Sequence, residues 1–299
     1  MVDVDSTNQI FKLKDGRNLS FVEFGDSDGM PIFYFHGQNS SSQEIRLFIG
    51  ENKLINCRII AVNRPGINLS DFVKYKILDF PNDIIELADS MNIKKFAILG
   101  GSGGAPFVCS CAHKIPDRVT VCGIVSGLAP LEYGIEEMEK KKRMELFLAR
   151  RMNWLFKMIL SAQRSVLKKL EKRNEEEILK FFTKMAENAS ESDKKILLNP
   201  YNTRIILNLM SEALFNLKGV SHVTRLYAKS WDFELKDIPK TVKFFLWHGE
   251  QDKSVPVSMA KKFCQNLPNC TGKFLKGEGH FSTFVNHFEE IINTLIGNS

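Results

Sequence analysis

One run of small residues constrains the fold more than anything else in this 299-residue chain, namely Gly100-Gly101-Ser102-Gly103-Gly104. It directly follows the apolar run Phe96-Ala97-Ile98-Leu99, and a helix-like stretch begins after it at Pro106. A chain that turns from strand to helix at one residue strains that residue's backbone and leaves no room for side chains two positions before and after it. We therefore predict that Ser102 lies on such a turn, with its hydroxyl raised clear of a sheet.

A glycine-rich loop at the start of a helix can also bind phosphate through its backbone amides. A phosphate loop of the Walker type would have a lysine just after its last glycine, whereas Ala105-Pro106 follows here. The composition of the turn therefore favours a nucleophilic serine over a phosphate site.

The segments around this turn predict a parallel sheet. A hairpin is expected between residues 11 and 24, and an amphipathic helix between residues 79 and 91. Apolar runs without polar alternation, which are typical of strands covered on both faces, occupy residues 32–35, 58–62, 96–99, 119–125 and 242–247. Helical patterns separate several of these runs, so we expect an α/β fold with helices on both faces of the sheet.

Residues 131–230 interrupt this alternation. The segment has almost no strand-like run and is rich in Lys, Glu, Leu and Met, the composition of stacked helices. It holds 20 Lys and Arg against 13 Asp and Glu, which more than accounts for the net charge of +6. We predict one sheet domain built from residues 1–130 and 231–299, with residues 131–230 inserted as a helical cap.

Composition excludes several other classes of protein. The six cysteines have neither C-x-x-C nor metal-ligand spacing, so we interpret them as buried thiols and expect no metal and no cofactor. The first residues lack the apolar core of a signal peptide, and no apolar run approaches the length of a membrane span. We expect a cytoplasmic protein that does not bind nucleic acid, because no stacking or base-reading motif accompanies its basic runs.

Five short motifs together resemble the α/β-hydrolase fold. Each lies at the carboxyl end of an expected strand, where open α/β sheets place their sites. The motifs are Phe33-Tyr34-Phe35-His36-Gly37, the run from Asn63 to Ser70, the Ser102 turn, the run from Trp247 to Pro256, and Gly277-Glu278-Gly279-His280-Phe281. The match extends from about residue 10 to residue 296 and is similar to a subgroup of capped serine hydrolases with a Gly-Gly-Ser-Gly-Gly turn.

This resemblance implies a catalytic triad. Ser102 would be the nucleophile, and His280 is the one of six histidines in a short loop after the final strand, where this fold places its base. Asp252, on the loop after a late strand, would orient His280 and gives the chain order Ser, Asp, His. Glu250 stands two residues away and is the alternative acid.

The same resemblance implies an oxyanion hole made of backbone amides. Its donors would be Gly103, which follows the nucleophile, and Gln38, which follows His36-Gly37. We expect His36 to brace this loop rather than take part in chemistry. Because Ser102 has glycine on both sides, we also expect an uncrowded wall beside the nucleophile.

The expected function is that of a cofactor-independent serine hydrolase acting on a small carboxylic ester or thioester with an apolar acyl group. The alternatives are a ligand receptor on the same fold, and an aminopeptidase or amidase. The latter would need an acidic group in the cap to hold a free amine, and the basic balance of the cap argues against it. The sequence does not predict the oligomeric state.

A run rich in Met and aromatic residues, from 146 to 160, could line an acyl pocket or lie on an anionic membrane. We expect these side chains to form the core of the cap instead. Contact with a membrane surface is the alternative.

Overall fold

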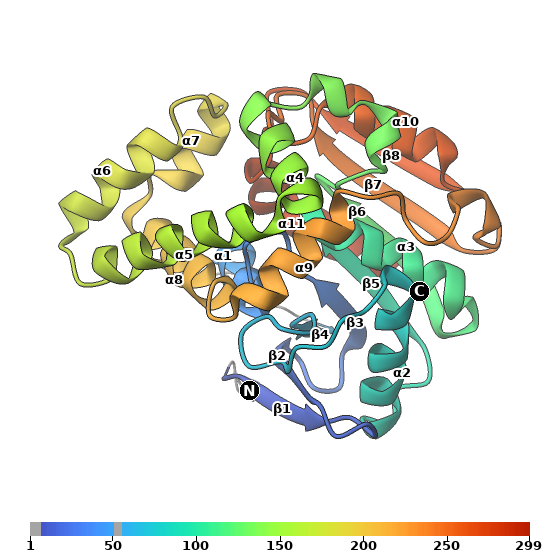
Figure 1. The fold of residues 1–299 in the computed structure, drawn as a ribbon. Coiled ribbons are helices and arrows are strands. Elements are labelled where there is room, and N and C mark those ends of the chain that lie inside the picture. The colour runs from blue at the N-terminus through green and yellow to red at the C-terminus, as the bar shows by residue number, and fades with distance from the viewer. Residues whose placement is uncertain (1–6, 51–55) are drawn as a thin grey trace.

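The computed structural model describes residues 7–50 and 56–299 and has an eight-stranded sheet at its centre (Figure 1). The strand order is β1-β2-β4-β3-β5-β6-β7-β8. The strands are β1 (Gln9–Lys12), β2 (Asn18–Gly25), β3 (Met30–Phe35), β4 (Cys57–Val62), β5 (Phe96–Gly101), β6 (Val119–Val125), β7 (Lys243–Gly249) and β8 (Cys270–Leu275). Strand β2 pairs antiparallel with β1 and β4, and every other neighbouring pair is parallel.

Helices cover both faces of this sheet, as the continuous apolar strands predict. On β5, Phe96 and Ile98 pack into one core cluster and Ala97 and Leu99 into the other, because successive side chains point to opposite faces. The first cluster includes residues of α2 (Phe80–Ser90), α3 (Ala105–Lys114) and α10 (Val257–Asn266). The second includes residues of α1 (Ile45–Ile49) and α11 (Ser282–Ile296).

Six helices are inserted between the parallel neighbours β6 and β7. They are α4 (Lys140–Arg151), α5 (Asn153–Leu170), α6 (Glu175–Met185), α7 (Glu191–Leu197), α8 (Pro200–Ala213) and α9 (Leu217–Tyr227), called here the inserted helices. Four begin at a side-chain cap, from Asn174, Ser190, Asn199 and Asn216, which bonds the first free backbone amides. Figure 1 shows α5–α8 gathered to one side of the sheet, while α4 and α9 lie closer to its centre.

The run 146–160 is only partly a core of these helices. Leu146, Ala149, Phe156 and Leu160 are buried, as expected, but Phe147, Trp154, Met158 and Ile159 are exposed. The prediction is wrong for the second group because α4 and α5 each bury one stripe, and these four side chains lie on the outer side.

Two further features concern the chain as a whole. All six cysteines have free thiols, four of them buried. None of the helices described here is both long and apolar enough to cross a bilayer.

Candidate active site

Ser102 stands at the junction of β5 and α3 with a backbone φ of +48°. L-residues rarely adopt this conformation, and the sequence predicts it for this turn. A Cβ on Gly100 would lie 2.6 Å from Val108, and one on Gly104 would overlap the carbonyl oxygen of Phe35. Both glycines are therefore required by the close approach of β5, α3 and β3.

The side chain of Tyr227, on α9, packs against Gly103, which lies between Ser102 and Gly104. The Tyr227 hydroxyl donates to the Gly103 carbonyl at 2.8 Å, and a Cβ on Gly103 would lie 2.7 Å from that hydroxyl. The expectation of an uncrowded wall beside Ser102 is therefore wrong. The glycine makes room for a tyrosine of the inserted helices, which fills the space.

The loop after β3 lies against this turn. A Cβ on Gly103 would lie 3.1 Å from the backbone nitrogen of Gln38, and one on Gly37 would lie 3.5 Å from the Cβ of Ser102. The two amides expected to form the oxyanion hole, those of Gln38 and Gly103, are thus on adjoining segments next to Ser102.

A half-buried glutamate and a buried arginine hold this loop in place. The carboxylate of Glu44 accepts from the Gly37 N–H at 2.8 Å and from the Tyr34 hydroxyl at 2.5 Å. The guanidinium of Arg64 donates to the carbonyls of His36 at 2.6 Å and Gly37 at 2.8 Å. Because each of these groups is bonded to several atoms of the loop or of β3, together they restrain the loop.

His36 belongs to this bracing, as expected from the sequence. Its ring is buried, and its Nδ1 lies 3.0 Å from Arg64 Nη2 and 2.9 Å from the Gly37 carbonyl. Burial, together with the Arg64 charge, lowers the pKa of His36 well below its ordinary value, so this ring is neutral.

The side chain of Gln38 reaches the inserted helices. Its Nε2 donates to Glu145 Oε1 of α4 at 2.7 Å and to Thr224 Oγ1 of α9 at 3.2 Å. Its Oε1 accepts from Lys142, also on α4. The residue with one expected oxyanion donor is therefore tied to two inserted helices.

Asp252 and His280 meet at the carboxyl ends of β7 and β8. Asp252 Oδ2 lies 2.7 Å from His280 Nδ1, and Asp252 Oδ1 accepts from the backbone amides of Ser254 and Val255 at 2.8 and 2.9 Å. Glu250, the alternative acid, is exposed, and its amide bonds to the Leu275 carbonyl. The structure thus places Asp252, rather than Glu250, against His280.

The two groups shift each other's pKa in opposite directions. Burial opposes ionisation of Asp252, but the charge and hydrogen bond of His280 outweigh it and lower the carboxyl pKa. Burial also opposes protonation of His280, yet the charge and hydrogen bond of Asp252 raise the His280 pKa above its ordinary value of 6.5. This pairing fixes a proton on His280 Nδ1 and leaves Nε2 as the acceptor.

A carboxylate from the inserted helices also holds the His280 loop. Asp193 of α7 accepts from the backbone amides of His280, Phe281 and Ser282 at 2.8, 2.9 and 2.9 Å. These amides are at the start of α11, where unpaired donors and the helix dipole favour a negative charge. The negative charge of Asp193 also contributes to the raised pKa of His280.

The segment that follows β6 is bonded to the backbone of both Ser102 and His280. The Leu128 amide donates to the Ser102 carbonyl at 2.9 Å, and the Ser126 hydroxyl donates to the His280 carbonyl at 3.0 Å. Among the hydrogen bonds of the described residues, none joins Ser102 directly to His280.

Sequence reasoning missed three of the residues that hold this site together. Glu44 and Asp193 each stand three positions after a serine, Ser41 and Ser190, in the pattern that marks a helix start. That signal predicts the helix starts but not the backbone amides outside those helices that these carboxylates bind. Arg64 lies within the Asn63-Arg64-Pro65-Gly66 motif, which was the available signal for it.

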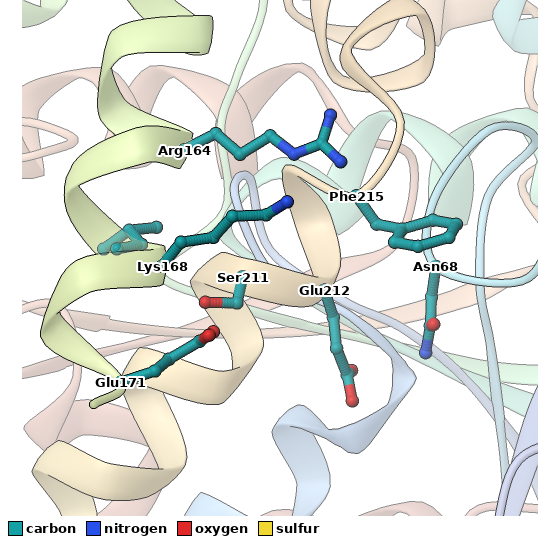
Figure 2. A pocket seen from close by; sticks show the side chains of 8 residues that line it. Asn68, Arg164, Lys168, Glu171, Ser211, Glu212 and Phe215 are labelled. Atoms are coloured by element: carbon teal, nitrogen blue, oxygen red, sulfur yellow. The ribbon is translucent and has the colours of Figure 1, made fainter.

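Two cavities lie where the inserted helices meet the sheet domain, and neither has Ser102 or His280 in its lining. Figure 2 shows the first, of about 290 Å³, with Arg164 and Lys168 extending from α5 across α8 toward Phe215. The carboxylate of Glu212, also in this lining, bonds to Ser41 in the loop that follows Gln38. The second cavity, of about 300 Å³, lies between α5, α9 and residues 72–74. Among the described residues, no cluster of three or more His, Cys, Asp or Glu side chains could hold a metal ion.

Comparison with known proteins identifies the family. The model of the alpha/beta hydrolase fold matches residues 30–287, so the chain belongs to this family, and the fold class expected from the five motifs is confirmed. A comparison with curated proteins finds no match.

Solved structures agree with this fold. A hydrolase from Pseudomonas aeruginosa PA01 is similar with a TM-score of 0.65 at 14% identity, covering 98% of this chain and 99% of that one. An esterase from Exiguobacterium antarcticum has a TM-score of 0.65 at 16% identity, covering 97% and 98%. A bromoperoxidase from Bacillus anthracis has a TM-score of 0.64 at 16% identity, covering 97% and 100%. At these identities the likeness concerns the fold alone.

Proposed function

We propose that this chain is a serine hydrolase that cleaves a carboxylic ester or thioester with an apolar acyl group, through an acyl-enzyme intermediate. The observation that carries the proposal is the 2.7 Å contact between Asp252 and His280, at the same sheet edge as the strained turn of Ser102. A carboxylate that fixes the imidazole tautomer is the part of the machinery that a purely structural serine turn would not need.

In the proposed mechanism, His280 Nε2 accepts the proton of Ser102 while Oγ attacks the carbonyl carbon. The backbone amides of Gln38 and Gly103 stabilise the oxyanion that forms. His280 then protonates the leaving group, and water, activated by the same imidazole, releases the acid. The inserted helices act as a cap, because Tyr227 and the partners of Gln38 lie over the oxyanion side of the site.

The surroundings of Glu145 favour an ester substrate over a peptide with a free amino terminus, the substrate of an aminopeptidase. This carboxylate is the acid of the inserted helices that contacts Gln38, and it is bonded to Lys142 at 3.2 Å as well as to Gln38 Nε2. Because its negative charge is already paired with Lys142, it offers a free amine little net attraction.

The test is turnover of p-nitrophenyl esters from acetate to palmitate by wild type and Ser102→Ala, with fluorophosphonate labelling in parallel. Multiple turnover that Ser102→Ala lowers by about 10⁴ or more supports the proposal. Labelling of Ser102 with slow or single turnover and tight product retention would support a receptor instead. If the folded wild-type protein shows no turnover and is not labelled, the proposed triad is refuted.

A further inference from the structure

The exposed apolar side chains of this protein are concentrated on two adjacent helices. Twelve large apolar side chains are exposed among the described residues, and half of them fall on α4 and α5, namely Met144, Phe147, Trp154, Met158, Ile159 and Val166. Single exposed apolar residues are ordinary, but a cluster on one element marks a surface that binds something.

These six side chains lie outside the stripes that α4 and α5 bury. On α4 the buried residues are Leu146 and Ala149, and on α5 they include Phe156 and Leu160. Both helices contact α9 and each other, so their buried sides face the molecule and their exposed sides point outward. The exposed sides of the two adjacent helices α4 and α5, defined by these six residues, are here called the outer cap face.

The helices that carry this surface are also strongly basic. Residues 140–170 contain ten Lys and Arg but one acid, Glu145. Among the described residues, the single ion pair within this range is Lys142–Glu145 at 3.2 Å, on the inner side next to Gln38. Arg150 and Arg151, both exposed, form no ion pair with any carboxylate in the part of the chain that the structure describes.

We propose that the outer cap face docks on an anionic lipid bilayer, with α4 and α5 lying in the plane of the headgroups. A helix with aromatic and Met residues on one side and unpaired basic residues beside them has the composition of such in-plane helices. Helix α5 alone is about 27 Å long, long enough to present several apolar residues to the interface. The anionic lipid supplies the negative charge that the chain itself does not provide there.

Docking in this orientation would bring the active site close to the membrane. The inner side of α4 binds Gln38 through Lys142 and Glu145, while its outer side carries Met144 and Phe147. Substrates that partition into the bilayer, such as esters with apolar acyl groups, would then reach the site directly. This last step rests on the proposed function, whereas the docking itself does not.

The test uses full-length Ser102→Ala protein, so that binding is measured without turnover. Flotation with vesicles of phosphatidylcholine alone is compared with vesicles of an equal mixture of phosphatidylcholine and phosphatidylserine. We expect binding to the mixed vesicles, a blue shift of tryptophan emission as Trp154 leaves water, and release by high salt. Trp247 is buried and reports little of this change.

Paired variants separate the outer cap face from general effects. The pair Trp154→Ser/Met158→Ser removes side chains that are 65% and 61% exposed, and Tyr201→Ser/Phe215→Ser removes a matched pair that is 65% and 60% exposed elsewhere. Arg150→Gln/Arg151→Gln removes two adjacent cations, and Lys94→Gln/Lys95→Gln removes an equally adjacent, exposed pair at the amino end of β5. We expect each variant of the outer cap face to weaken vesicle binding by about tenfold or more, and each control by less than about twofold.

Several outcomes would overturn the proposal. One is no binding to the mixed vesicles by the folded Ser102→Ala protein, and another is equal loss of binding in the variants and their controls. A third is a dimer that Trp154→Ser/Met158→Ser dissociates and that does not bind vesicles, which would make the outer cap face an interface between two copies of the chain. Because all measurements use the Ser102→Ala background, an absence of esterase activity would leave this result unaffected.

Discussion

Asp193, on helix α7, accepts a hydrogen bond from the backbone amide of His280 at 2.8 Å. The contact joins the inserted helices to the loop that carries the proposed catalytic base. The same carboxylate binds two further amides at the start of α11, so it acts as a helix cap supplied by a distant segment. Since the His280 ring is held by Asp252 and its backbone by Asp193, its position depends on both parts of the molecule.

Asp193→Asn should therefore impair the site in two measurable ways. The amide keeps one acceptor oxygen but loses the charge and one accepting position, so the His280 loop is held less firmly. Small displacements of catalytic groups are costly, and we expect turnover of the best ester to fall by about tenfold to a hundredfold. The loss should appear mainly in kcat, because the residue does not contact the proposed substrate site.

A purely structural role for Asp193 would lower stability without moving the pH profile. Since the Asp193 charge helps to raise the pKa of His280, Asp193→Asn should also move the acidic limb of kcat/KM to lower pH. Asp193→Glu, which keeps the charge, should restore the limb at least in part. Glu191→Gln is the control, because Glu191 is an exposed residue of the same helix that bonds to Lys194. An acidic limb that stays at the wild-type position in Asp193→Asn would contradict this prediction.

The wild-type pH profile is a separate prediction. The base must be neutral to accept the proton of Ser102, and the Asp252 charge raises the His280 pKa above 6.5. Activity should therefore fall as the pH drops through a midpoint above 6.5, and removal of the charge in Asp252→Asn should lower activity strongly at every pH. The measurement is kcat/KM from about pH 5 to about pH 9, a range that spans the ordinary pKa of histidine. A midpoint well below 6.5 would show that a different group limits the reaction.

Much of this architecture could be predicted from local patterns. The turn at Ser102, the strands on either side of it and the loop of His280 each have a short-range signature of glycines, apolar runs and chain order. The contact between Asp252 and His280 follows from the same logic, because both stand just past the ends of neighbouring parallel strands. Signals of this kind depend on a few adjacent residues and survive without any knowledge of packing.

The links between the inserted helices and the sheet domain could not be predicted in this way. Tyr227 over Gly103, Asp193 at the start of α11 and the partners of Gln38 join residues more than 80 positions apart. Which side chain fills such a space depends on how the helices pack, and periodicity alone does not distinguish an inward stripe from an outward one. The error over Trp154 and Met158 has the same origin.

The close contact between Gly103 and Tyr227 predicts that a substitution at position 103 destabilises the fold and that a substitution at position 227 partly offsets this loss. A Cβ at position 103 would lie 2.7 Å from the Tyr227 hydroxyl and 3.0 Å from the ring carbon that bears it. Gly103→Ala should therefore destabilise the fold by about 1–3 kcal/mol in denaturant unfolding, the usual cost of overpacking. Tyr227→Phe removes the nearest atom at a cost of about 0.5–1.5 kcal/mol for its hydrogen bond.

In the double variant the two losses should be less than additive, because the phenylalanine gives the new methyl group room. Gly297→Ala, where a Cβ would meet its nearest neighbour at 3.4 Å, is the control and should change stability little. Strict additivity of Gly103→Ala and Tyr227→Phe would mean that the tyrosine does not limit the space at this position.

The side chain of Gln38 offers a test of whether the inserted helices help to build the oxyanion hole. The proposed donor is the backbone amide, which Gln38→Ala retains, but the variant loses the bonds to Lys142, Glu145 and Thr224. We expect kcat to fall by about tenfold, far less than the loss of about 10⁴ or more in Ser102→Ala, because the donor remains but is less well positioned. Glu145→Ala should cause a similar loss. If both act through the same contact, the double variant should be no worse than either single one. Independent, multiplicative losses would instead mean that Glu145 does not act by positioning Gln38.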